Sequence, residues 1–145
     1  MKKETATYAL GCFWGPDDYF SKLPGVIKTT VGYTGSTNKN PTYNNLGDHT
    51  EAVEIEFNPD KISYEDLLEK FFMYHDPTFT QITQYRSTIF FHNNDQKRLA
   101  REAKKKSQEQ HKGEILTSIE TAGKFWPAEE YHQKYFQKHN ISGVC

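Results

Sequence analysis

The chain has 145 residues, and its 18 Lys and Arg residues nearly balance its 19 Asp and Glu residues, for a net charge of −1. This near-neutral charge excludes a long-range field that would gather nucleic acid or an anionic membrane. Its 10 Phe, 9 Tyr and 2 Trp residues exclude an intrinsically disordered chain, because such chains are poor in aromatic residues.

The length is sufficient for one domain with its own hydrophobic core, and no repeat or linker divides the chain. We therefore expect a single domain over residues 1–145. The first seven residues are largely polar and no apolar segment follows them. No stretch approaches the roughly 20 apolar residues that a membrane-spanning helix needs. We expect a cytoplasmic monomer that does not contact a membrane.

The first half of the chain predicts strands on either side of a short helix. A strand is expected over 5–10, ending at Gly11, followed by a helix with Pro16 in its first turn. The turn residues Leu23-Pro24-Gly25 end that helix, and the β-branched run 26–33 predicts the next strand. The irregular segment 34–50 is long for a small domain, and such segments are often functional.

The second half predicts one amphipathic strand and a capped helix before a more polar end. Val53, Ile55 and Phe57 alternate with glutamates, and Ser63 with Asp66 resembles a capping box. The remaining elements are a loop over 75–84, a strand over 86–91, a helix over 95–111, a strand over 115–119, a helix over 128–139 and an irregular tail over 140–145. Together these elements indicate a two-layer α/β sandwich of the α+β class.

The strongest local motif is Gly11-Cys12-Phe13-Trp14-Gly15, between a predicted strand and a predicted helix. Helix amides favour a thiolate at Cys12, whereas the nearby carboxylates Asp17 and Asp18 oppose it. From the residues alone, Cys12 is either a small buried hydrophobic residue or a nucleophile, and both interpretations stay open.

This pentapeptide resembles the signature of the A-class peptide-methionine sulfoxide reductases. Five further segments resemble that family in the same order along the chain. They are Val31-Gly32-Tyr33-Thr34-Gly35, Asn40-Pro41-Thr42-Tyr43, His49-Thr50-Glu51-Ala52-Val53, Thr83-Gln84-Tyr85-Arg86-Ser87, and Phe125-Trp126 through Glu130-Tyr131-His132-Gln133. The resemblance implies a ferredoxin-like plait with a mixed, largely antiparallel sheet. It also implies an oxidoreductase that repairs methionine-S-sulfoxide, free or in oxidised proteins.

The resemblance assigns a role to each candidate residue. Cys12 attacks the sulfoxide sulfur and is left as a sulfenic acid, and Glu51 is the acid that protonates the oxygen. Tyr43 and Tyr85 match the tyrosines that hydrogen-bond this oxygen. Phe13 and Trp14 match the apolar pocket for the S-methyl group. Without the resemblance, Glu51 would be interpreted as a solvated residue beside Glu54 and Glu56, Tyr43 and Tyr85 as edge residues, and Trp14 as core.

Cys145 is the candidate resolving cysteine, because family members often carry one near the carboxyl terminus. The tail 140–145 is expected to be mobile enough to reach Cys12, where a second thiol would convert the sulfenic acid to a disulfide. The alternative is an idle terminal thiol. Thioredoxin or another dithiol would reduce the disulfide, so the resemblance implies neither a metal nor an organic cofactor.

The chain departs from the family ahead of the Thr83-Gln84-Tyr85 segment, where the loop is short. The position of the family's active-site aspartate falls on Thr80 or is deleted, and Asp76 and Gln84 are the candidates to replace it. This departure leaves open which group holds that rim of the pocket.

Other functions fit less well. His49-Thr50-Glu51 matches the His-x-Glu of zinc deaminases, but the Pro-Cys-x-x-Cys partner motif is missing from the sequence. The basic residues between 97 and 106 indicate a solvated helix face rather than a nucleic-acid patch. Two competing classes remain, a peroxide reductase that uses Cys12 and a non-catalytic module that binds oxidised methionine or senses redox state.

Overall fold

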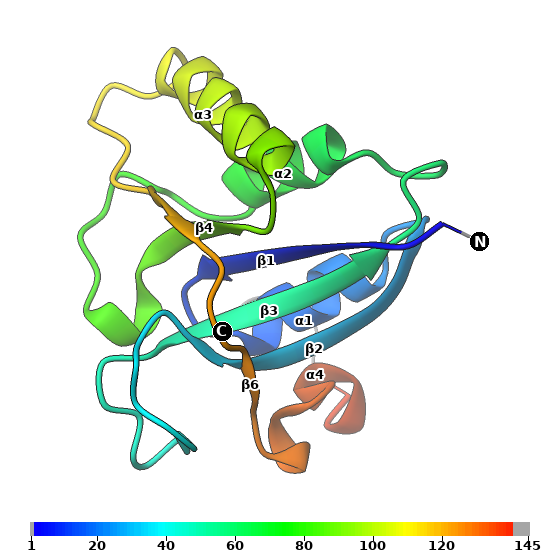
Figure 1. Cartoon of the computed structure of the whole chain (residues 1–145), viewed down its shortest axis with the longest axis vertical. Coiled ribbons are helices and arrows are strands. Elements are labelled where there is room, and N and C mark those ends of the chain that lie inside the picture. The colour runs from blue at the N-terminus through cyan, green and yellow to red at the C-terminus, as the bar shows by residue number, and fades with distance from the viewer. Residues whose placement is uncertain (1, 141–145) are drawn as a thin grey trace.

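A computed structural model describes residues 2–140 and shows one six-stranded sheet with helices packed on it (Figure 1). The strand order is β5-β4-β1-β3-β2-β6, and every pair is antiparallel except the parallel pair β4–β5. The strands are β1 (Glu4–Leu10), β2 (Val26–Thr34), β3 (Thr50–Phe57), β4 (Ser87–Phe91), β5 (Ser118–Thr121) and β6 (Trp126–Pro127). The helices are α1 (Trp14–Ser21), α2 (Tyr64–Tyr74), α3 (Asn94–Gln108) and α4 (Tyr135–Lys138), with short 3-10 helices η1 (Thr83–Tyr85) and η2 (Glu130–His132). This arrangement confirms the predicted two-layer fold with a mixed, largely antiparallel sheet.

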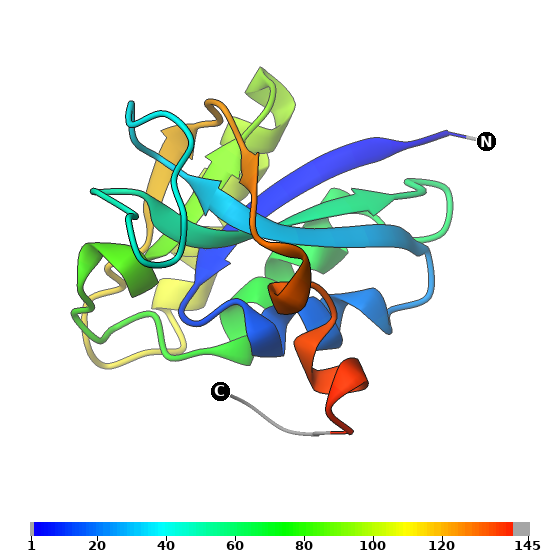
Figure 2. The same cartoon turned by 90° about the horizontal axis from the view of Figure 1, so that it is seen from below.

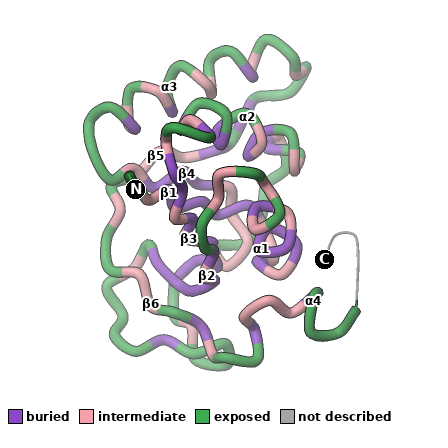
Figure 3. Tube along the Cα trace, turned by 90° about the vertical axis from the view of Figure 1, so that its right-hand side faces the viewer, coloured by how far each residue is buried: buried purple, intermediate pink, exposed green. Residues whose placement is uncertain are grey.

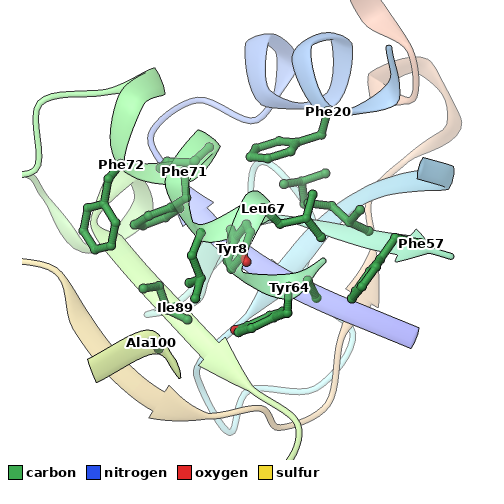
Figure 4. Packing of buried hydrophobic residues seen from close by; sticks show 14 of the residues in the cluster. Tyr8, Phe20, Phe57, Tyr64, Leu67, Phe71, Phe72, Ile89 and Ala100 are labelled. Atoms are coloured by element: carbon green, nitrogen blue, oxygen red, sulfur yellow. The ribbon is translucent and has the colours of Figure 1, made fainter. Parts of the chain in front are cut away.

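The main core lies between the sheet and the helices α1, α2 and α3. Alternate residues of β1, namely Ala6, Tyr8 and Leu10, point to this side, where Tyr8 packs against Phe71 of α2 at 5.0 Å between ring centroids. Figure 4 shows the aromatic and aliphatic side chains that fill the layer, and Figure 2 shows α1 and α2 along the same side of the sheet. Burial falls off toward α3, whose exposed face dominates one edge of the molecule in Figure 3.

The opposite face of the sheet is covered by the chain segment that precedes β6. Ala9, Ala52 and Phe90 form a second, smaller cluster there, with Ala122 and Phe125 packed against it. Gly32 of β2 allows this approach, because a Cβ atom at Gly32 would lie 2.4 Å from the Trp126 carbonyl oxygen. Both faces of the central strands are therefore shielded from solvent near β6.

Most sequence predictions for α2 and β3 are confirmed. Ser63 accepts the backbone N–H of Asp66 and the Asp66 carboxylate accepts that of Ser63, which is the predicted capping box. Val53, Ile55 and Phe57 are fully buried. None of the helices in the described range 2–140 has the length and apolar character needed to cross a membrane.

The prediction of a strand over 115–119 is wrong by three residues. The backbone N–H of Ile115 donates to the side chain of Gln108, and that of Leu116 donates to the Pro77 carbonyl. These donors are therefore engaged elsewhere, and pairing with β4 begins only at Ser118.

The prediction of one continuous helix over 128–139 is also wrong. Ala128 donates its N–H to Val31 of β2, and Lys134 adopts a left-handed backbone conformation with φ 54°. The Lys134 N–H and ammonium both bind the buried Asp17 carboxylate, at 2.7 and 3.0 Å. Because strand β2 and Asp17 capture these backbone donors, the segment forms only η2 and a short α4, which lies beside α1 as Figure 2 shows.

Candidate active site

Cys12 lies in the tight connection between β1 and α1. Gly11 has φ +98°, a conformation that favours glycine, and it turns the chain from the strand into the helix. Phe13 caps α1 and accepts the N–H of Asp17 at 3.1 Å, so half-buried Cys12 immediately precedes the helix amides. The positive end of the helix favours the thiolate at this position. The carboxylates of Asp17 and Asp18 are bound by Lys134 and Lys22, at 3.0 and 2.9 Å, which reduces their opposing charge.

The Glu51 carboxyl group is buried beside this turn. Its side chain is 1% exposed, and its Oε1 accepts the backbone N–H of Phe13 at 3.2 Å. The interpretation of Glu51 as a solvated residue is wrong, because Glu51 shares the strand face of Val53 and not that of Glu54. Burial raises the pKa of Glu51, and the hydrogen bonds from Gln84 and Phe13 oppose that rise only in part.

Of the two residues expected to replace the family's aspartate, Gln84 contacts Glu51. Its amide nitrogen donates to Glu51 Oε2 at 2.5 Å. Asp76, the other candidate, instead accepts the N–H of Thr78 at 2.9 Å and the hydroxyl of the same residue at 2.6 Å. Thr80 is exposed. The short loop thus leaves Gln84 as the residue that meets the buried carboxyl group.

The two candidate tyrosines come together from different segments. Tyr43 lies in the irregular loop between β2 and β3, and Tyr85 ends η1. Burial, followed by a hydrogen bond with the Tyr43 hydroxyl and the charges of Glu51 and Cys12, raises the pKa of Tyr85 well above its usual value. The Tyr85 hydroxyl is therefore protonated at neutral pH, and it lies within electrostatic reach of both Cys12 and Glu51.

Phe13 and Trp14 occupy different environments. Phe13 is 1% exposed and packs against Tyr33 and His132, with ring centroids 5.8 and 5.2 Å away. Trp14 is half-buried and stacks on Tyr135 of α4, at 3.8 Å between centroids and 6° between planes. Of the two proposed pocket residues, Trp14 has the larger solvent-exposed fraction.

The segment from Glu129 to Tyr135 closes one side of the site. His132 accepts the indole N–H of Trp14 at its Nδ1, at 3.0 Å, and its ring lies 4.9 Å from that of Tyr43. Glu129 accepts the Tyr33 hydroxyl at 2.9 Å and the backbone N–H of Tyr43 at 3.1 Å. Burial alone would raise the pKa of Glu129, but hydrogen bonds from its own backbone N–H, from the N–H of Tyr43 and from the Tyr33 hydroxyl lower it, so the group binds Tyr43 as a carboxylate.

His132 and Glu129 have no role predicted from the sequence. Both lie in or beside the Glu130-Tyr131-His132-Gln133 segment that carries the family resemblance. Their positions follow from the left-handed backbone conformation at Lys134, which interrupts the helix and is not indicated by the hydrophobic periodicity of the sequence. Burial lowers the pKa of His132, against the effect of Glu129, so its imidazole is neutral.

Two further features of the described residues lie outside this cluster. In the described range 2–140, no group of three or more His, Cys, Asp or Glu side chains is placed to hold a metal ion. A groove of about 860 Å³ lies between α2 and α3, lined in part by Phe72, Met73 and Leu99, and its lining includes none of the candidate residues. The proposed resolving residue Cys145 lies outside the described residues.

Comparison with known proteins places the chain among sulfoxide reductases. The sequence model of the family described as peptide methionine sulfoxide reductase matches residues 4–145. The peptide methionine sulfoxide reductase MsrA of Methanothermobacter thermautotrophicus is 45% identical, over 93% of this chain and 87% of that protein. The enzyme of the same name from Bacillus licheniformis is 47% identical, over 95% and 83%.

Solved structures agree with these sequence matches. Reduced Mxr1 from Saccharomyces cerevisiae superposes with a TM-score of 0.91 at 29% identity, covering 99% of this chain and 90% of that one. Mxr1 in complex with Trx2 superposes with a TM-score of 0.71 at 28% identity, covering 92% and 85%.

Proposed function

The chain belongs to the peptide methionine sulfoxide reductase family, and we propose that its reduction of methionine sulfoxide takes place at the Cys12 site with Glu51 as the acid. The observation that carries this assignment is the buried Glu51 carboxyl group. Its pKa is raised by burial, and it accepts a hydrogen bond from the backbone N–H of Phe13, the residue next to Cys12. A carboxyl group in this setting is suited to deliver a proton at neutral pH.

The first step is attack of the Cys12 sulfur on the sulfoxide sulfur. The sulfoxide oxygen takes up one proton as it passes to the Cys12 thiolate, its bond to the substrate sulfur breaks, methionine leaves, and Cys12 becomes a sulfenic acid. The substrate sulfur gains two electrons and the Cys12 sulfur loses two, so the reaction balances without another cofactor. Glu51 supplies a proton to the oxygen, and the hydroxyl groups of Tyr43 and Tyr85 hydrogen-bond it.

The S-methyl group of the substrate would rest against Trp14, backed by Phe13. An apolar surface on one side of the sulfur and hydroxyl donors on the other distinguish the two sulfoxide diastereomers. This arrangement supports selection of one diastereomer, and the family resemblance implies that it is the S form.

Regeneration needs a second thiol and then a dithiol reductant. We propose that Cys145 condenses with the sulfenic acid, which releases water and forms a disulfide. A protein of the thioredoxin type then reduces that disulfide. The structure of Mxr1 with Trx2 supports this class of partner. We further propose a single-domain, cytoplasmic monomer that uses neither a metal nor an organic cofactor.

The decisive experiment measures turnover of separated S and R diastereomers of a blocked methionine sulfoxide with dithiothreitol. We expect turnover of the S form alone and its complete loss in Cys12→Ser. Equal use of both diastereomers would contradict the proposed pocket. If the unmodified protein binds methionine sulfoxide but does not reduce either diastereomer, it is a binding module. Rapid consumption of hydrogen peroxide with indifference to sulfoxide would indicate a peroxidase.

The matched control is Cys145→Ser, assayed without reductant and then with thioredoxin. Because attack precedes resolution, this variant is expected to release one methionine per chain but to lose sustained turnover with thioredoxin. Sustained turnover at the full rate would show that Cys145 is idle.

A further inference from the structure

His132 contacts Phe13, Trp14 and Tyr43, three of the aromatic residues of the proposed substrate site. It is 2% exposed, and its ring is close to three aromatic groups from three segments of the chain. Phe13 precedes α1, Tyr43 belongs to the loop before β3, and Tyr131 is its neighbour, with ring centroids 5.2, 4.9 and 4.2 Å away. Trp14 adds a hydrogen bond to this set of contacts.

The hydrogen bond with Trp14 determines the tautomer of the imidazole. An indole nitrogen is only a donor, so His132 Nδ1 must be the acceptor in the 3.0 Å contact. In a neutral imidazole the proton then lies on Nε2. This Nε2 atom is buried and has no hydrogen-bond partner within residues 2–140.

A buried donor without a partner costs free energy, and phenylalanine would fill the same space without that cost. The Nε2 proton is nevertheless required if Nδ1 is to accept from Trp14. The contribution of histidine at this position is therefore the hydrogen bond that it accepts from Trp14, in addition to its packing.

The indole of Trp14 is held from two directions as a result. Tyr135 stacks on its face at 3.8 Å, and His132 fixes the rotation of the ring in its plane. The backbone break at Lys134, bound to Asp17, separates η2 from α4 and allows His132 and Tyr135 to reach the same tryptophan.

We propose that His132 is the positioning residue of the substrate pocket, which orients Trp14 for the S-methyl group through its Nδ1 acceptor. This proposal rests on the proposed function of Trp14. His132 itself does not touch the reacting atoms, so the expected effect of its loss is on substrate binding and not on proton transfer.

The test compares two substitutions of His132 with a control. His132→Phe keeps a ring against Phe13 and Tyr43 but removes the acceptor, and we expect KM for a blocked methionine-S-sulfoxide to rise about tenfold while kcat changes less than threefold. His132→Asn restores an acceptor near the position of Nδ1 and is expected to return KM to within about threefold of the original. His111→Phe, at the groove between α2 and α3, is expected to leave both constants unchanged.

A spectroscopic measurement keeps this test independent of catalysis. The indole N–H resonance of Trp14, assigned with Trp126→Phe, is expected to move upfield in His132→Phe and to remain near its original position in His132→Asn. If the unmodified protein fails to turn over S-sulfoxide, the proposed function falls, while the resonance still reports on the His132–Trp14 bond. An unchanged resonance and KM in a folded His132→Phe variant would overturn the positioning role, as would a loss confined to kcat.

Discussion

The side-chain amide of Gln84 donates a 2.5 Å hydrogen bond to the buried carboxyl group of Glu51, from a 3-10 helix to a strand 33 positions earlier. An amide has both a donor and an acceptor, so Gln84 is able to bind either protonation state of Glu51 after rotation of the amide. In the observed orientation it donates, which favours the carboxylate and lowers the pKa of Glu51 relative to burial alone.

Replacement of Gln84 tests this control over the acid. Gln84→Met removes the donor, so we expect the pKa of Glu51 to rise and the alkaline limb of the activity profile to move to higher pH, by on the order of half to one pH unit. The measurement is the rate of methionine release in a single turnover between pH 5 and 10. A uniform loss of activity, with an unshifted profile, would mean that Gln84 only positions Glu51.

Much of the site was accessible from the sequence because it lies in local motifs. The strand-turn-helix around Cys12, the alternation in β3 and the capping box of α2 are short-range patterns, and the structure confirms them. The burial of Glu51 was also readable, since Glu51 is in phase with Val53 and Ile55 rather than with Glu54. The family resemblance supplied the roles of Glu51, Tyr43 and Tyr85, which remain predictions.

The parts that sequence reasoning missed depend on contacts between distant segments. The residues after Ala128 have helical spacing, but the backbone donors of Ala128 and Lys134 bind Val31 and Asp17 instead. No local pattern indicates that a buried carboxylate about 120 positions away captures a backbone amide. The strand over 115–119 was misplaced for the same reason, since the amide of Leu116 donates to the carbonyl of Pro77 in the loop after α2.

The buried ion pair of Asp17 and Lys134 provides a second prediction. Asp17 is completely buried, and Lys134→Met removes its countercharge while two neutral donors remain, the Thr29 hydroxyl at 2.6 Å and the Lys134 N–H at 2.7 Å. We expect the free energy of unfolding to fall by about 2 to 4 kcal/mol, because an unpaired carboxylate stays buried. Urea denaturation measures the change.

The double variant Asp17→Asn/Lys134→Met is the control for this pair. It removes both charges, so it is expected to be less destabilised than the sum of the two single variants. Strict additivity would show that the ammonium and carboxylate are not coupled.

His75 gives a third prediction, on the pH dependence of stability. Its Nδ1–H donates to the Phe71 carbonyl at 2.9 Å, and its Nε2 accepts from the Ser87 hydroxyl at 2.8 Å. Burial lowers the pKa of His75 to about 4, against 6.5 in the unfolded chain. Below pH 6.5 the unfolded chain therefore binds a proton that the folded protein does not, so the contribution to stability is complete above pH 6.5 and is lost as the pH falls to about 4.

The variant His75→Gln removes this titration. The unmodified protein is expected to lose about 2 to 3 kcal/mol more stability than His75→Gln between pH 6.5 and 4, as measured by urea denaturation at each pH. Parallel pH curves for the two proteins would contradict the assignment.

The distance along the chain between Trp14 and His132, 118 positions, has a consequence for biosynthesis. At a translation rate of about 5 to 20 residues per second, Cys12 is incorporated roughly 6 to 24 seconds before His132. During this interval the thiol belongs to a nascent chain without Glu129, His132 or Tyr135, so its indole neighbour has no hydrogen-bond acceptor and no stacking partner from that segment. The contacts of Trp14 with His132 and Tyr135 therefore form only after the last part of the chain has been made, and a chain stalled before residue 129 lacks both of them.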